Sequence, residues 1–472
     1  MRTCQYNNSN KHWSLSEYNN NNAWYYNGNN GRFNNNNKYN SNECRPVLEL
    51  YYDDSHLEDY PIPYSDFLGY YKICRRHKRN KPSQLLFEID LVDNLIKLCH
   101  EANFGEYETS RSIVFIITQP KPREVIAADF RDRIIQTIIV QKLQPHLEAY
   151  MHPDSYSCRV GKGGLKAALM FKEYLREVSE NYTKDCWVYS LDFHSFFMSI
   201  DSHLWTQRLL DFADEHYEEA DWQVLFKLIP KVYLSLPQLN CVKKSPPWMW
   251  SLIDPSKSLL HKTDGIGLPI GNVTSQNMAN FCTTPYLRRM EKVADKFVHY
   301  TDDNKGIVRD KKRFLKSLNQ IKKDCWEQDH LIIHPKKFDI QHYSKGTRIG
   351  AYKIRFDRIL PNDRIAHNFK YKITKAIESA ERDEKYIYKH KEDFMATINS
   401  YLGILKHCNS YRLKREYIEK LKHSRWNIVF KFAPDYHKVT IRKEYTQVEW
   451  QKRANKAKRK AFLELAQQLK TE

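Results

Sequence analysis

The sequence lacks a cysteine pair at metal-binding spacing, a long apolar run and an excess of acidic residues. Its ten cysteines include no CxxC pair and no short spacing that would close a zinc site, so we interpret them as reduced core thiols. No apolar run reaches the roughly 18 residues that span a bilayer. The polar start MRTCQYNNSN also lacks the apolar segment of a signal peptide, so we expect a cytoplasmic protein with no membrane partner.

Positive charge is in excess. The chain has 472 residues, and 76 Lys and Arg oppose 57 Asp and Glu, for a formal net charge of +19. The excess is greatest after residue 360 and in CRRHKRNK, residues 74–81. A polyanionic partner is the first interpretation, and a solvated basic surface without a specific role is the alternative. The 31 Tyr and 22 Phe favour the first, because their planar faces can stack on unpaired bases, which suits single strands and RNA.

The chain divides into four segments by composition. Residues 1–46 are an Asn-rich low-complexity segment, for which we expect disorder unless it orders on RNA or on a neighbouring subunit. Residues 47–108 have helical apolar spacing and predict a helical N-terminal extension. Strands and helices alternate without a regular βαβ repeat over residues 109–364, which predicts an α+β fold. Residues 365–472 predict long basic helices and a basic tail.

Within the central segment, several elements are predicted directly. We expect strands within 111–120 and 185–192, helices over 129–151 and about 164–180, and hairpins at 297–309 and 347–361.

Two adjacent carboxylates, Asp302 and Asp303, lie in FVHYTDDNKGIVR, residues 297–309, which reads as a strand, a tight turn and a strand. This repelling pair is explained if a divalent cation offsets its charge. Mg²⁺ takes one or two carboxylates directly and completes its octahedron with water and phosphate oxygens. Asp192, at the end of the apolar strand WVYSL, is the candidate third carboxylate of a two-metal site. The alternative is an Asp-rich surface turn, because a YxDD string also arises by chance.

With the segments around it, YTDD makes the chain resemble a reverse transcriptase over about residues 110–415. YSLDFHSFFMSID is similar to the strand that carries the first metal ligand, and YTDD is similar to the catalytic hairpin. The resemblance implies a right-hand polymerase fold of fingers, palm and thumb, with a helical N-terminal extension and a helical C-terminal thumb. It also implies two Mg²⁺ ions, with Mn²⁺ as a substitute, held by Asp192, the backbone carbonyl of Phe193, Asp302 and Asp303.

The same resemblance assigns roles to further residues. Phe197 falls at the steric gate that selects deoxynucleotides, and Lys337, or else Lys336, in LIIHPKKFDI falls near the departing pyrophosphate as a general acid. Each of these segments taken alone could be ordinary core, turn or loop. The remaining assignments are triphosphate contacts from Lys121 and Arg123, nucleotide contacts from Ile270, Gly271 and Gln276, template contacts from Arg159 and Lys162, and a primer grip at RIGAYKI, with Tyr352.

The loop GLPIGNVTSQ narrows the resemblance. Most relatives have Pro-Gln-Gly where this chain has Pro269, Ile270 and Gly271, a pattern similar to diversity-generating retroelement enzymes and to defence-associated bacterial reverse transcriptases. An apolar side chain removes hydrogen bonds near the incoming nucleotide, so we expect relaxed fidelity or an unusual nucleotide preference. The segment INSYLGILKHCNSYRLKRE, residues 398–416, resembles the thumb of these enzymes. We find no Val-Thr-Gly thumb motif, Asn-Ala-x-x-His segment or HNH-like endonuclease signature.

The resulting hypothesis is an RNA-directed DNA polymerase that makes cDNA from a partner noncoding RNA, in anti-phage defence. The region of about 110 residues before the fingers favours defence over the alternative, a mutagenic enzyme of a diversity-generating retroelement. An RNA polymerase or terminal transferase on the same palm, and an inactive RNA-binding scaffold, are rival hypotheses. Deoxynucleotides, an RNA template and a DNA product are the expected partners, and homo-oligomerisation and priming from a Tyr hydroxyl stay open.

Overall fold

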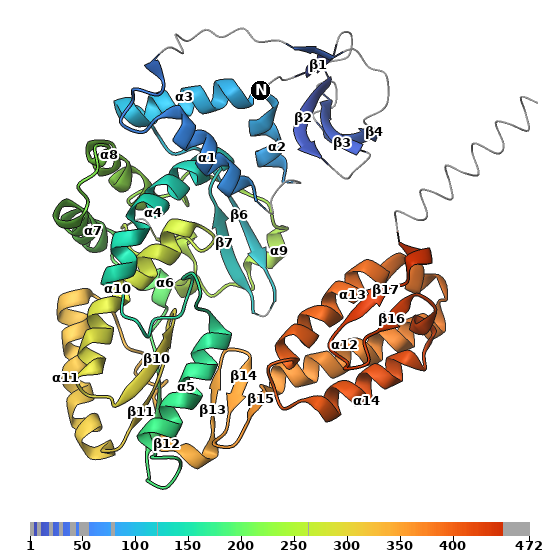
Figure 1. The fold of residues 1–472 in the computed structure, drawn as a ribbon. Helices are drawn as coiled ribbons and strands as arrows, with labels where there is room; N and C mark the ends of the chain where they lie inside the picture. The colour runs from blue at the N-terminus through green and yellow to red at the C-terminus, as the bar shows by residue number, and fades with distance from the viewer. Residues whose placement is uncertain are drawn as a thin grey trace, which may run out of the picture.

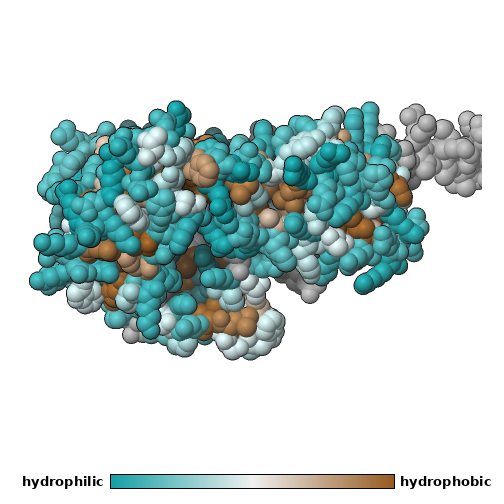
Figure 2. All heavy atoms as spheres, turned by 90° about the horizontal axis from the view of Figure 1, so that it is seen from below, coloured by the Kyte–Doolittle hydropathy of each residue, from teal (hydrophilic) through white to brown (hydrophobic). Residues whose placement is uncertain are grey.

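The computed structural model describes residues 4–6, 11–17, 22–27, 32–37 and 44–46, and then 56–446 apart from 77–80, 120 and 263. Figure 1 shows an N-terminal group of helices, a central body of mixed sheet and helix, and a C-terminal helical domain. The face seen in Figure 2 is mostly hydrophilic, with apolar residues in small patches. Among the helices of the described residues, none combines the length and the apolar composition needed to cross a membrane.

The Asn-rich N-terminal segment contains strands, which corrects the expectation of disorder. Aromatic residues 24–26 favour extended backbone, and antiparallel pairing satisfies the backbone N–H and C=O groups of a polar chain without a large apolar core. One sheet of order β4-β3-β2-β1-β5 contains β1 (Cys4–Tyr6), β2 (Lys11–Glu17), β3 (Asn22–Asn27), β4 (Arg32–Asn37) and β5 (Cys44–Pro46).

Three N-terminal helices share one core with the central body. They are α1 (Tyr64–Arg75), α2 (Pro82–Ile89) and α3 (Leu91–Phe104). Buried Phe67 and Leu95 belong to the same apolar cluster as Ile134 and Ile138 of α4 (Phe130–Tyr150). The predicted helical extension is therefore part of the main core and not a separate domain.

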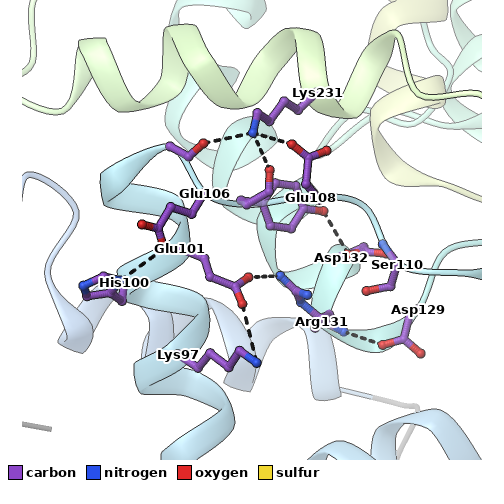
Figure 3. A network of polar contacts seen from close by, with 12 residues as sticks. Lys97, His100, Glu101, Glu106, Glu108, Ser110, Asp129, Arg131, Asp132 and Lys231 are labelled. Carbon is purple, nitrogen blue, oxygen red and sulfur yellow. Dashed lines mark hydrogen bonds and ion pairs between the residues drawn. The ribbon is translucent and has the colours of Figure 1, made fainter.

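A polar network ties the end of α3 to α4 and to α8 (Trp222–Tyr233). Lys231 of α8 donates to the carbonyls of Gly105 at 2.9 Å and Tyr107 at 2.8 Å, and pairs with Glu108 at 2.7 Å (Figure 3). The Tyr107 hydroxyl donates to Asp132 at 2.9 Å. Asp132 is 2% exposed, and burial raises its pKa to about 6. The connection between the N-terminal helices and the body is therefore hydrogen-bonded, and it is buried at Tyr107 and Asp132.

The fingers region is a small sheet beside α4. Strands β6 (Ser112–Ile117) and β7 (Arg123–Ala127) form an antiparallel hairpin, and β9 (Cys241–Lys243) pairs with β6 in parallel. The apolar run predicted β6, whereas β7 was not predicted.

The palm is a four-stranded antiparallel sheet of order β10-β11-β8-β12. Its strands are β8 (Trp187–Asp192), β10 (Lys296–Tyr300), β11 (Asp303–Val308) and β12 (Asp339–His342). On one face, Val188 packs with Phe171 of α5 (Gly164–Val178). On the other, the Tyr189 ring stacks on Phe314 of α11 (Lys311–Asp329), with centroids 4.5 Å apart, beside α10 (Val273–Glu291). Burial on both faces explains why β8 is apolar almost throughout.

The remaining elements of the central body are the helix α7 (Ser202–His216) and several short ones. The short ones are α6 (Phe196–Ser199), α9 (Pro247–Trp250) and 3₁₀ turns at Pro255–Lys257, Leu259–His261 and Tyr343–Lys345.

A three-stranded meander leads from the palm to the C-terminal domain. The meander packs on α5 and contains β13 (Thr347–Ile349), β14 (Tyr352–Ile354) and β15 (Ile359–Pro361). Beyond it lie α12 (Asp363–Arg382), α13 (Lys385–Leu405), α14 (Tyr411–Lys422), β16 (Phe430–Phe432), β17 (Val439–Ile441) and 3₁₀ turns at Arg425–Ile428 and Lys443–Tyr445. They enclose a second core around Trp426, whose members all lie within residues 369–445. The basic tail lies outside the described residues.

Candidate active site

Three aspartates meet at one end of the palm sheet. Asp192 ends β8 and pairs in register with Asp303, which begins β11. Asp302 lies in the two-residue turn between β10 and β11, and its carbonyl accepts a hydrogen bond from the Phe193 N–H at 3.3 Å. The antiparallel register thus brings together carboxylates that are far apart in the chain.

The turn that carries Asp302 is strained. Thr301 has a φ of 60°, a left-handed conformation that β-branched residues rarely adopt. Adopting it costs about 1–3 kcal/mol. Its hydroxyl lies 2.7 Å from that of Ser157. The Tyr156 N–H donates to the His299 carbonyl at 2.9 Å, so the loop before α5 grips the hairpin from outside the sheet. These contacts hold Asp302 at a fixed place despite the strain.

The carboxylates repel one another. Asp302 lies at the surface, yet the protein around it displaces much of its water, and this desolvation, with the charges of Asp192 and Asp303, raises its pKa to about 6. Desolvation also raises the pKa of Asp303, while Lys305 opposes that shift. A cation between these groups would therefore relieve an unfavourable concentration of negative charge.

Two lysines neutralise part of that charge. Lys337 forms an ion pair with Asp192, and Lys305 lies 3.0 Å from Asp303. The His334 N–H donates to the Asp192 carbonyl at 2.7 Å, which holds the segment carrying Lys337 beside β8. Lys337 is 59% exposed, so it can leave Asp192 when a cation or a phosphate arrives.

The donor set fits Mg²⁺ as an ion shared with substrate. In the part of the chain that the structure describes, no three His, Cys, Asp or Glu side chains already form a site for one ion. Mg²⁺ needs only one or two carboxylates when water and phosphate oxygens fill its other positions. Asp192 and Asp302 supply such hard oxygens, whereas Asp303 is turned to Lys305. The expected cage of three carboxylates is thus not preformed.

Phe197 and Ile270 pack against one apolar cluster between the palm and the fingers. The Phe197 carbonyl accepts the Leu268 N–H at 2.6 Å, and the Ile270 carbonyl accepts the Ile126 N–H of β7 at 2.9 Å. The loop at 266–272 is therefore bonded to both the gate candidate and the fingers sheet. The buried members of this cluster are Val114, Ile126, Met198 and Leu259.

Gly271 permits the close approach of that loop to β7. Its φ is 126°, and a Cβ atom there would lie 2.9 Å from Val125 Cγ1, so a larger residue would push the loop from the fingers. Gln276 is exposed on the first turn of α10. The loop is therefore packed closely on β7 at Gly271.

Lys121 and Arg123 are exposed next to each other at the fingers hairpin. The charge of Arg123 lowers the pKa of Asp302, opposing the effects that raise it, so this guanidinium lies within electrostatic reach of the carboxylates. The structure therefore places Arg123 on the same side as the aspartates.

Arg159 and Tyr352, which we predicted to contact nucleic acid, have side chains that are buried in the protein. The Arg159 side chain is 4% exposed, and it pairs with Glu148 at 2.7 Å and donates to the His152 carbonyl at 2.6 Å. Tyr352 is 6% exposed and packs in the apolar cluster under α5. Each side chain therefore contacts protein: Arg159 within the loop before α5, and Tyr352 from strand β14.

Lys162 is held more loosely in the same loop. It donates to the Pro153 carbonyl, and its ammonium lies 5.1 Å from the Tyr156 ring centre.

Three residues near the aspartates were not predicted: Ser157, Lys305 and His334. Lys305 follows Asp303 by two residues, and strand periodicity places both side chains on one face, so this signal was available in the sequence. The contacts of Ser157 and His334 depend on distant pairing and left no local signal.

A cavity of 670 Å³ lies beside α6. Its walls include His194, Met198, Trp326 and His330, and none of the three aspartates lines it. It is therefore separate from the carboxylate site.

Comparisons with known proteins agree with this architecture. The sequence model described as reverse transcriptase (RNA-dependent DNA polymerase) matches residues 119–404, and it confirms the right-hand polymerase fold expected from the sequence. No curated protein sequence matches the chain.

Similar solved structures include two telomerases. One is an apo telomerase from Candida tropicalis truncated from its C-terminal domain, with 10% identity, a TM-score of 0.40, and coverage of 54% of this chain and 55% of that chain. Another is telomerase from Candida albicans in complex with the TWJ fragment of telomeric RNA, with 9% identity, a TM-score of 0.40, and coverage of 68% and 57%. The chain thus spans little more than half of each.

Proposed function

The chain belongs to the reverse transcriptase family, and from that premise we propose that it is an RNA-directed DNA polymerase that makes cDNA on a partner noncoding RNA. The observation that carries this proposal is the register of β8 and β11, which sets Asp192 opposite Asp303 beside the turn residue Asp302.

Asp192 and Asp302 would hold Mg²⁺, or Mn²⁺ as a substitute, with Asp303 and the Phe193 carbonyl as further ligands. When bound, such ions favour deprotonation of the attacking primer hydroxyl and neutralise the leaving pyrophosphate. The raised pKa values of Asp302 and Asp303 support this assignment, because they reflect negative charges that a bound cation would offset.

The other residues position the nucleotide. Arg123 and Lys121 bind the triphosphate from the fingers, where the planar guanidinium can contact phosphate through two N–H groups. Phe197 excludes a ribose 2′-hydroxyl. Lys337, beside Asp192, donates a proton to the departing pyrophosphate oxygen.

The proposed RNA partner rests on charge. Residues 363–446 contain 19 Lys and Arg against 11 Asp and Glu, and such a domain holds RNA chiefly through phosphates and 2′-hydroxyls.

Anti-phage defence is the biological role that we propose. It is supported by the N-terminal helices, which are built into the main core and give the enzyme a surface of its own beyond the polymerase elements. The mutagenic enzyme of a diversity-generating retroelement is the second candidate, because the relaxed fidelity expected from Ile270 suits it, although the Pro-Ile-Gly pattern is shared with defence enzymes. Sequencing the nucleic acid that copurifies with the protein separates them. One dedicated RNA with its cDNA supports the first, and cDNA carrying dense substitutions supports the second.

The polymerase proposal is tested with the double variant Asp302→Asn and Asp303→Asn. Metal-assisted charge stabilisation is worth several kcal/mol, so primer extension on RNA should fall by at least about 100-fold. RNA binding should persist, because the basic surfaces are unchanged. Asp214→Asn, an exposed carboxylate on α7, is the matched control and should keep activity. Undiminished extension by the double variant would end the proposal.

A further inference from the structure

The Lys305 side chain on β11 contacts its own strand and the neighbouring strand β8. Its ammonium lies 3.0 Å from Asp303 Oδ1 on its own strand and donates to Ser190 Oγ on β8 at 2.9 Å. Lys305 and Ser190 are register partners, so the cross-strand contact follows from the pairing that sets Asp303 opposite Asp192. The Lys305 side chain is only 14% exposed, whereas that of Asp303 is 43% exposed.

This arrangement differs from that of Lys337. Lys337 is 59% exposed on an irregular segment after α11, and one ion pair holds it at the site. Lys305 is part of a regular strand and has two fixed partners, so it cannot withdraw when a cation binds. Its charge therefore stays beside the carboxylates at every stage of the reaction.

We propose that Lys305 is a built-in counter-charge that holds one carboxylate oxygen of Asp303, weakens Asp303 as a further ligand of a divalent cation, and lowers the affinity of the site for that cation. The inference rests on the proposed function, because it takes Asp192 and Asp302 as the cation ligands. A positive charge fixed near the ligands repels the cation directly, and it also holds one carboxylate oxygen of Asp303. Lys305 is thus a positioning residue that sets the cation concentration at which the enzyme works.

The test is a titration of the full chain with Mn²⁺, in which the electron paramagnetic resonance signal of the free ion gives the dissociation constant. Lys305→Met removes the charge and keeps an unbranched side chain, and we expect it to tighten Mn²⁺ binding about tenfold, as loss of a nearby unit charge at intermediate dielectric implies. Lys305→Arg keeps the charge and should bind as the unchanged protein does. Ser190→Ala removes the cross-strand anchor but keeps the charge, so it should tighten binding less than Lys305→Met does. Lys296→Met, on β10 at the end of the hairpin away from the aspartates, is the matched control and should leave the affinity unchanged. The half-saturating Mg²⁺ concentration in primer extension should fall with Lys305→Met in parallel.

The outcomes separate the inference from its premise. Tighter binding by Lys305→Met that is absent from Lys305→Arg and from Lys296→Met supports it, and equal or weaker binding by Lys305→Met overturns it. Asp192→Asn is measured beside these variants. If it leaves Mn²⁺ binding unchanged, the cation site itself is misplaced and the proposed function fails, taking the inference with it. If Asp192→Asn abolishes binding while Lys305→Met has no effect, only the inference on Lys305 is wrong. Lys305→Gln replaces Lys305→Met if the latter does not show cooperative thermal unfolding.

Discussion

The gate prediction depends on how firmly one ring is held. Phe197 packs against the cluster between palm and fingers, and its carbonyl bonds to Leu268, so the ring cannot easily turn away from an incoming nucleotide. Phe197→Ala should therefore raise ribonucleotide use relative to deoxynucleotide use by about tenfold to a hundredfold. The ratio of the two kcat/KM values measures this change. Met198→Ala loses packing in the same cluster without opening the gate, and an equal change in that variant would attribute the effect to packing.

A buried histidine should make stability depend on pH. His299 is fully buried, and burial lowers its pKa to about 3, whereas an unfolded histidine titrates near about 6.5. Below that pH the unfolded state takes up a proton that the folded state refuses, so the free energy of unfolding falls by up to about 1.4 kcal/mol per pH unit toward pH 3. Urea unfolding of the protein and of His299→Leu should diverge between pH 6 and 4, with the unchanged protein losing more. Parallel pH curves would contradict this assignment.

At the scale of elements, the sequence predicted what a local pattern can specify. The apolar run of β8 and the YTDD turn gave both halves of the aspartate site, because each half is encoded within a few residues. Strands β7, β12, β16 and β17 were missed, since they have only three to five residues, too few for a clear periodic pattern, and β12 in addition pairs with the distant β8. The burial of Arg159 and Tyr352 was not foreseen, because a motif locates a segment but not the direction of every side chain in it.

The connection after α3 offers a stability prediction for an element. Lys231→Met removes the donor to the Gly105 and Tyr107 carbonyls, and leaving such acceptors unpaired costs about 1–3 kcal/mol. Chemical unfolding should show this loss in one cooperative transition with the body, because the N-terminal helices share its core. Lys227→Met, an exposed site on the same helix, is the control. Equal stability of the two variants would show that the Lys231 contacts make no net contribution to the free energy of unfolding.

The hydrophobic cores of the whole molecule do not coincide with the four segments that composition suggested. The predicted boundary near 108 runs through one continuous core, whereas the boundary near 364 separates two clusters. At the second boundary Ile404 and Cys408 pack against the cluster under α5, and the Asn409 N–H donates to the Ile359 carbonyl at 2.7 Å, so a few specific contacts join the two parts. A helical region can look like an appendage in sequence because its apolar face does not reveal which partner covers it.

Two truncations follow from this division and should behave oppositely. Removing residues 363–472 takes away a domain with its own core, so the remaining chain should still unfold cooperatively, while its affinity for RNA and the salt dependence of that affinity decrease. Removing residues 1–108 strips α1 to α3 from the core that also supports α4, and the remainder should aggregate or lose its cooperative transition. Calorimetry of the full chain should accordingly show a transition for the C-terminal domain that is absent from the first truncation. A cooperative second truncation with intact primer extension would mean that the N-terminal helices merely rest on the polymerase, in which case the argument that links them to its biological role would lose its basis.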